Sequence, residues 1–156
     1  MMEMSNEQVN VKDKIKEWLE KEGFFVEETD NENTLFNFIL EYPINSGRKV
    51  LILQPKDKED SIQVICDLVI SEKHRKNLKN MEKMSREKFF WELRYGLLAR
   101  EGFFQLIPNE DDLRLIRVRQ NIYYDSLTKG KLMETLLENH KCTTFVIWKF
   151  AENFGY

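Results

Sequence analysis

The chain has little of what makes a disulfide-rich, secreted or membrane protein. It contains 2 cysteines, 3 prolines and 6 glycines in 156 residues. Cys66 and Cys142 lie far apart in the sequence and do not indicate a disulfide framework. No apolar run approaches the ~20 residues of a membrane-spanning helix, and the start of the chain lacks the apolar core of a signal peptide. We therefore expect a cytoplasmic protein that does not associate with membranes.

Strong charge of one sign is also missing. The formal net charge is -3, which disfavours a protein that binds nucleic acid through its overall charge, although a local basic patch is compatible with it. Hydrophobic residues make up 42% of the chain and aromatic residues 12%, enough to bury a core that offsets the entropy of ordering. We predict a flexible N-terminus over residues 1–10 and a single domain over residues 11–156.

Motifs that carry chemistry are absent as well. The sequence has no glycine-rich phosphate-binding fingerprint, no nucleophile elbow and no zinc-protease motif. His140 and Cys142 lack the second cluster of ligands that a metal site needs. The adjacent carboxylates Glu110, Asp111 and Asp112 fall in a predicted solvated turn, where nothing desolvates one of them. We predict no catalytic residue, no metal and no cofactor. An enzyme with a site assembled from scattered residues stays a separate hypothesis.

What the chain does have is hydrophobic periodicity, which predicts an α+β fold. Helical spacing over residues 11–22 is followed by strands at 35–42, 49–54 and 61–71, with a brief extra strand at 24–28. A long helical stretch runs from Ser71 to Glu101 with a break near Ser85, and a hairpin spans 102–124. Thr128 caps the last helix, in which residues 142–154 have strand-like composition but helical spacing. The order is α-β-β-β-α-β-β-α, with helices against an antiparallel sheet.

The tetrapeptide Glu-Gly-Phe-Phe occurs twice, at residues 22–25 and 101–104. In both copies the glycine follows a predicted helix, where a left-handed conformation costs glycine nothing. A phosphate-binding loop would need the reverse order, with the strand before the glycines and the helix after them. We interpret both glycines as helix stop signals.

The long middle helix has apolar residues on most sides. A helix that covers one face of a sheet needs only one apolar stripe, so the remainder predicts a second contact. That contact can be another helix of the chain, a second subunit or a client peptide. The predicted dimer or partner surface consists of Phe89, Phe90, Trp91, Tyr95 and Leu98.

Cationic side chains are concentrated in the segment N-terminal to this surface and on the predicted hairpin. Cations at a helix start oppose the helix dipole, so local helix stability does not explain them. Together they could suit RNA or an acidic protein, although a solvated surface is the simpler explanation. The predicted basic patch consists of Arg75, Lys76, Lys79, Lys83, Arg117 and Arg119.

Two segments carry a resemblance to known families. Residues 74–98, HRKNLKNMEKMSREKFFWELRYGLL, and 122–138, IYYDSLTKGKLMETLLE, are similar to a family of small, mostly archaeal proteins of unknown function. The order of elements also resembles the type III secretion chaperone-like fold shared with YbjN-like proteins. That fold implies homodimers that hold an extended partner peptide, by fold analogy alone. Neither resemblance implies a catalytic residue.

Three hypotheses follow. The first is a non-catalytic homodimeric module that binds a protein or peptide. The second is an RNA- or nucleotide-associated protein that uses the basic middle helix and the hairpin arginines, and it is not favoured. The third is an enzyme whose site the sequence does not reveal.

Overall fold

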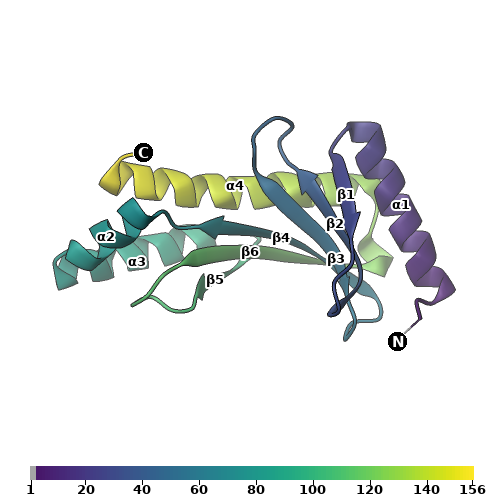
Figure 1. The fold of residues 1–156 in the computed structure, drawn as a ribbon, viewed down its shortest axis with the longest axis horizontal. Coiled ribbons are helices and arrows are strands. Elements are labelled where there is room, and N and C mark those ends of the chain that lie inside the picture. The colour runs from purple at the N-terminus through teal and green to yellow at the C-terminus, as the bar shows by residue number, and fades with distance from the viewer. Residues whose placement is uncertain (1–2) are drawn as a thin grey trace. The chain divides into compact units, whose positions relative to one another are not determined.

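The computed structural model describes residues 3–156, apart from the side chains at positions 25 and 26. The element order confirms the predicted α+β class, and the brief strand predicted after the first helix is present as β1 (Figure 1). The elements are α1 (Asn6–Glu22), β1 (Phe25–Thr29), β2 (Thr34–Glu41), β3 (Lys49–Pro55), β4 (Ser61–Val69), α2 (Glu72–Asn80), α3 (Lys83–Leu98), β5 (Phe103–Ile107), β6 (Leu115–Tyr123), the 3-10 turn η1 (Tyr124–Ser126) and α4 (Lys129–Phe154).

The strands form one six-stranded sheet in the order β1-β2-β3-β4-β6-β5. Consecutive strands from β1 to β4 pair antiparallel, as the short predicted connections require. The alternation in the sequence sets the register. Phe38 pairs with Ile52 and Leu40 with Val50, and all four side chains are buried. A slip of one residue would turn this buried row to the opposite face.

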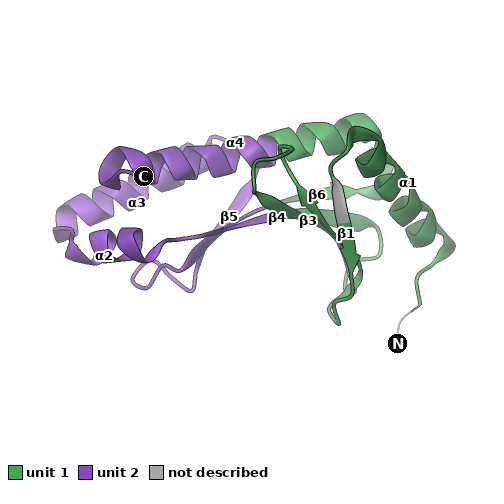
Figure 2. Cartoon of the chain, turned by 45° about the horizontal axis from the view of Figure 1, so that its top comes forward, with its two compact units in different colours: residues 1–65, 120–137 green, residues 66–119, 138–156 purple. Residues whose placement is uncertain are grey.

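The chain divides into two compact units, each made of two segments (Figure 2). Unit 1 comprises residues 1–65 and 120–137, and unit 2 comprises residues 66–119 and 138–156. Strands β4 and β6 and helix α4 contribute residues to both. Each unit is therefore discontinuous in sequence, and each is described by itself below.

In unit 1, helix α1 begins at Asn6, five residues before the apolar spacing indicated. Ser5 explains the earlier start. Its hydroxyl accepts a hydrogen bond from Gln8 N at 3.2 Å, while Gln8 Oε1 accepts one from Ser5 N at 2.9 Å. This reciprocal capping box satisfies two backbone donors at the helix start. Residues 6–10, which belong to the segment predicted to be flexible, are thus helical.

Gly23 ends α1 in the predicted way. It has φ 75°, and the amides of Gly23 and Phe24 donate to Glu20 O and Leu19 O at 3.1 and 2.9 Å. This is the left-handed helix stop that the sequence indicated.

We expect Gly23→Ala to lower the free energy of unfolding by about 1 kcal/mol, because alanine is strained at positive φ. Space does not limit the substitution, since the added Cβ would lie 3.8 Å from Ile44 Cδ1. Gly130→Ala in α4 is the matched control: its Cβ would have only an ordinary contact, at 3.9 Å, and alanine favours a helix. Urea melts of both variants test the cap, and a Gly23→Ala variant at least as stable as the wild type would contradict it.

The second Glu-Gly-Phe-Phe copy is not a helix stop of this kind, so the predicted equivalence is wrong. Helix α3 ends at Leu98, followed by Ala99 in a right-handed conformation with φ -71°. Gly102 lies four residues beyond the helix end. The tetrapeptide is the same in both copies, but α1 ends directly before Gly23 whereas α3 ends four residues before Gly102.

The long middle helix is broken between Asn80 and Lys83, earlier than the predicted break near Ser85. Ser71 caps α2 by accepting a hydrogen bond from His74 N at 3.2 Å. Met81 then takes an extended conformation, and Glu82 is non-helical, with φ -57° and ψ 141°. Two short helices can point in different directions, which one long helix cannot.

Helix α4 is continuous over residues 129–154, which confirms the helical interpretation of residues 142–154. Thr128 caps it as predicted, with its hydroxyl 3.0 Å from Lys131 N. In unit 2, Val146 and Phe150 are buried at helical spacing. For residues 142–154, the helical spacing of the apolar side chains therefore predicted the structure correctly, and the strand-like composition did not.

The motif IYYDSLT, residues 122–128 at the start of the second family-like segment, fixes the turn between β3 and β4 in unit 1. Three successive carbonyls of that turn accept hydrogen bonds from three different elements. Gln54 Nε2 in β3 donates to Lys58 O, Gln8 Nε2 in α1 donates to Glu59 O at 3.1 Å, and Tyr124 N donates to Asp60 O at 2.7 Å. The Tyr124 hydroxyl in turn donates to Gln54 Oε1, which is fully buried. The motif thus has a structural role in this chain.

The core of unit 2 lies between α3, the second half of α4 and the sheet. Phe89, Phe90 and Leu93 from α3 are buried with Phe150 from α4 and Val118 from β6. Where α3 meets α4, Gly96 faces the ring of Phe145, and a Cβ built on this glycine would lie 2.0 Å from Phe145 Cζ. The two helices approach this closely because position 96 has no side chain.

Candidate functional site

The predicted dimer surface divides between two opposite faces of α3. Phe89 and Phe90 are buried in the core of unit 2, edge-to-face with ring centroids 5.4 Å apart. They cannot belong to a partner surface, and this part of the prediction is corrected. Their burial has a simple cause: they share a helical face with Leu93 and Leu97, and that face meets the sheet.

The other three predicted residues are exposed. The exposed fraction is 54% for Trp91, 64% for Tyr95 and 73% for Leu98. Met84, which the sequence interpretation missed, joins them with 76%. With Lys88, these residues are spaced alternately four and three apart along the side of α3 that faces away from its buried face. We call Met84, Lys88, Trp91, Tyr95 and Leu98 the α3 stripe. The 3.5-residue spacing was the signal that could have identified Met84.

Contacts with neighbouring side chains restrain the side chains of the α3 stripe. The rings of Trp91 and Tyr95 stack with centroids 5.7 Å apart, and the Arg94 guanidinium lies 5.2 Å from the Trp91 ring centroid. Arg94 is itself held by an ion pair with Glu110 from the β5–β6 turn. Lys88 Nζ lies 3.8 Å from a carboxylate oxygen of Glu92. Aromatic side chains restrained in this way lose little rotamer entropy when a partner covers them.

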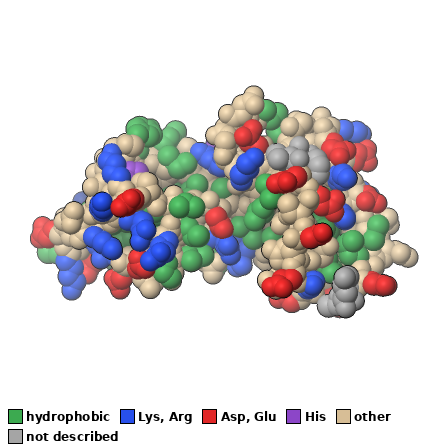
Figure 3. All heavy atoms as spheres, viewed as in Figure 1, with side chains coloured by type: hydrophobic (Ala, Val, Ile, Leu, Met, Phe, Trp, Pro, Cys, Tyr) green, Lys and Arg blue, Asp and Glu red, His purple; other side chains and the backbone are tan. Residues whose placement is uncertain are grey.

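The α2 part of the predicted basic patch lies next to carboxylates. Arg75 lies 3.6 Å from Asp112, and Lys76 lies 3.3 Å from Glu72. A hydrogen bond from Arg114 lowers the pKa of Asp112 below its usual value, which keeps that carboxylate charged beside Arg75. Lys79 and Lys83 are exposed. Figure 3 shows acidic side chains among the lysines and arginines over α2, and this mixture weakens the local field that phosphate binding requires.

The two hairpin arginines contact side chains of unit 2. Arg117 Nε and Nη2 donate to both carboxylate oxygens of Asp67, at 2.7 and 2.8 Å, and this pairing raises the pKa of Arg117. The guanidinium of Arg119 lies 5.1 Å from the centroid of the Phe103 ring. Both cations thus have short-range contacts that a nucleic acid would have to displace.

The Cys142 thiol is not poised for chemistry. It is almost fully buried, and burial together with the nearby Glu138 carboxylate raises its pKa to about 11. Glu138 is engaged by the Arg100 side chain at 2.9 and 3.2 Å. A protonated thiol is a poor nucleophile and a poor metal ligand. Among the described residues, no three His, Cys, Asp or Glu side chains gather as metal ligands would.

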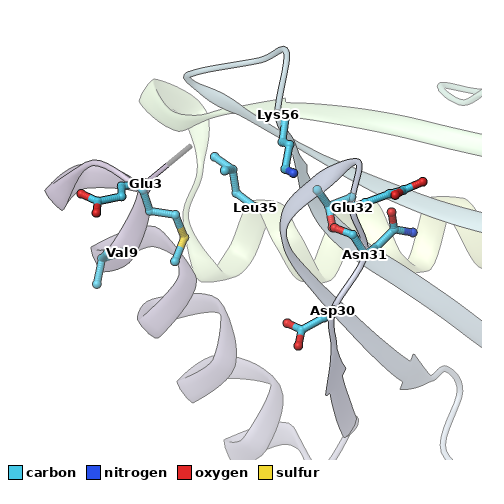
Figure 4. A pocket seen from close by; sticks show the side chains of 9 residues that line it. Glu3, Val9, Asp30, Asn31, Glu32, Leu35 and Lys56 are labelled. Atoms are coloured by element: carbon cyan, nitrogen blue, oxygen red, sulfur yellow. The ribbon is translucent and has the colours of Figure 1, made fainter. Parts of the chain in front are cut away.

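Unit 1 has an open cavity of about 860 Å³ between the start of α1 and the β1–β2 turn (Figure 4). Glu3 and Val9 line it from one side, and Asp30, Asn31 and Glu32 of the β1–β2 turn from the other, with Lys56 extending from the end of β3. The cavity is wide and its charged side chains are at the surface. It lacks the enclosed shape of a typical small-molecule site.

The fold and these surfaces define a small α+β protein whose most distinctive feature is an apolar stripe on the outside of a core helix. Residues 11–150 match the model of a family described as "Uncharacterized conserved protein (DUF2299)". The chain belongs to this family, which confirms the predicted membership in a family of unknown function. No curated protein matches the chain.

A solved structure supports this assignment. An uncharacterized protein from Methanothermobacter thermautotrophicus, an archaeon, has 30% identical residues and a TM-score of 0.86. The match covers 92% of this chain and 99% of the other. The likeness to secretion chaperones stays a prediction. Among the described residues, none of the helices has the length and apolar character that crossing a membrane requires.

Proposed function

We propose that the chain is a non-catalytic protein-binding module that forms a homodimer through the α3 stripe. One observation carries the proposal: α3 buries a complete apolar face inside its own unit and exposes a second row of large apolar side chains on the opposite face. Intramolecular packing explains the first face and leaves the second without a structural role.

The energetics favour association. Burial of apolar surface contributes about 25 cal/mol per Å², and a contiguous exposed apolar patch usually marks an interaction surface. A second copy is the simplest partner, because most soluble oligomers are homodimers with a two-fold axis. Trp91 lies in the middle of the stripe, where residues that dominate interface energies tend to lie.

The single variant Trp91→Arg is expected to convert the dimer to a monomer. The arginine would place a charge at the centre of the interface while the buried face of α3 stays intact. Trp148→Arg is the matched control, because Trp148 lies on α4 with a similar exposed fraction of 65%. Sedimentation equilibrium at high micromolar concentration should give twice 18.8 kDa for the wild type and the control, and 18.8 kDa for Trp91→Arg.

Circular dichroism of all three proteins should show the same helix content. A wild type that sediments at 18.8 kDa under these conditions would refute the homodimer. A Trp91→Arg variant that stays dimeric would place the interface elsewhere, and equal dissociation by both tryptophan variants would contradict an interface limited to the α3 stripe.

A further inference from the structure

We infer that the two copies pair antiparallel along the α3 stripe, with the two-fold axis at Trp91. This inference rests on the homodimer proposed above and specifies its geometry. Three features of the stripe carry it: its spacing, the position of Lys88 and the charges beside it.

The spacing of the stripe is that of a coiled-coil seam. From Met84 to Leu98 the steps are four, three, four and three residues, which is the alternation of the two inward positions of a heptad. The stripe spans 14 residues and is about 21 Å long at 1.5 Å per residue. A straight helix from a second copy can follow it along its whole length.

Lys88 decides between the two orientations. In a parallel pair in register, Lys88 would face Lys88 of the second copy inside the seam, and the two like charges would repel. In an antiparallel pair centred on Trp91, Met84 faces Leu98 of the second copy, and Lys88 lies within one residue step of Tyr95 on the same side of the seam. The ammonium can then lie over an aromatic face, which is attractive.

The flanking charges favour the same orientation. Glu87 and Arg94 occupy equivalent positions beside the seam, one heptad apart. Antiparallel pairing brings Glu87 within one residue step of Arg94 of the second copy, where Arg94 also pairs with Glu110 of its own chain, and the two-fold axis creates this contact twice. Parallel pairing places Glu87 opposite Glu92 instead, again twice. The antiparallel pair brings Glu92 near Glu92 of the second copy, but Lys149 of the same chain already contacts each of these carboxylates.

Cysteine cross-linking distinguishes the orientations. The variants are Met84→Cys, Leu98→Cys and the double variant, each in the natural background, where Cys66 and Cys142 are buried. An intrachain disulfide between positions 84 and 98 is excluded by the ~21 Å between them, because bridged Cα atoms lie within ~7 Å. Under mild oxidation, the double variant is expected to shift from monomer to covalent dimer on a non-reducing gel. Each single variant is expected to stay monomeric on the gel, like the oxidised wild type.

Each other outcome has a definite meaning. Cross-linking of Met84→Cys alone and of Leu98→Cys alone would show a parallel pair and overturn the inference. The absence of any cross-link in a protein that sediments as a dimer would also overturn it and would move the interface off the stripe. A wild type that sediments as a monomer would refute the proposed homodimer itself.

Discussion

Replacement of Gly96 by valine is expected to lower the free energy of unfolding by about 2–3 kcal/mol. A Cβ at position 96 would lie 2.0 Å from Phe145 Cζ and 2.5 Å from Phe145 Cε1, well inside van der Waals contact. Phe145 packs against the core of unit 2, so its ring has to leave that packing or α3 has to move. The two methyl groups of valine enlarge the clash.

The sign of the effect makes this a strict test. Helix propensity by itself predicts that Gly96→Ala stabilises the protein by about 1 kcal/mol. The observed contact predicts a net loss for alanine and a larger one for valine. Urea unfolding of both variants measures the difference. A more stable Gly96→Ala variant would show that the two helices do not approach as closely as the contact with Phe145 implies.

Phe145, the residue that Gly96 contacts, provides the control. In a Phe145→Ala background the obstructing ring is gone, and Gly96→Ala should then be neutral or stabilising. The change of sign between the two backgrounds is an interaction energy, which contacting residues show and distant residues do not. Additive effects would mean that the loss has another origin.

Tyr124→Phe is expected to lower the free energy of unfolding by about 1–3 kcal/mol, because it leaves the buried Gln54 Oε1 without its donor. The same glutamine holds Lys58 O, so its loss of order would loosen the β3–β4 turn. Tyr123→Phe is the matched control, since Tyr123 is adjacent in sequence and 56% exposed. Equal stability of the two variants in urea melts would contradict the structural role of the motif.

The same tyrosine gives the stability a dependence on alkaline pH. Burial, reinforced by the carboxylates of Glu7 and Asp60, raises the pKa of Tyr124 from 10.0 to about 12. Between these values the folded state keeps a proton that the unfolded state has lost. This contribution to stability is complete below pH 10 and is lost as the pH rises through about 12. The wild type should therefore lose stability more steeply than Tyr124→Phe over this range.

The sequence by itself determined the local elements. Alternation identified β2 and β4, and a short apolar run identified β3. Helical spacing identified α4 across a strand-like stretch, and Ser71, Thr128 and Gly23 marked helix ends through hydrogen bonds with near neighbours. Such signals act within a few residues, so the pattern that encodes them can be read from the sequence alone. They also led to the α+β class and to α3 as the helix with too many apolar residues.

Only the tertiary structure decided which of those apolar residues are free to meet a partner. Phe89 and Trp91 are both large, aromatic and on the same helix, yet one is in the core and the other is at the surface. The difference depends on which side of α3 meets β6 and α4, and those segments are distant in sequence. The same holds for Arg117, which faces Asp67 fifty residues away, and for Gly96, which is required by a ring at position 145. Contacts of this kind depend on the packing of whole elements, and no local pattern encodes their partners.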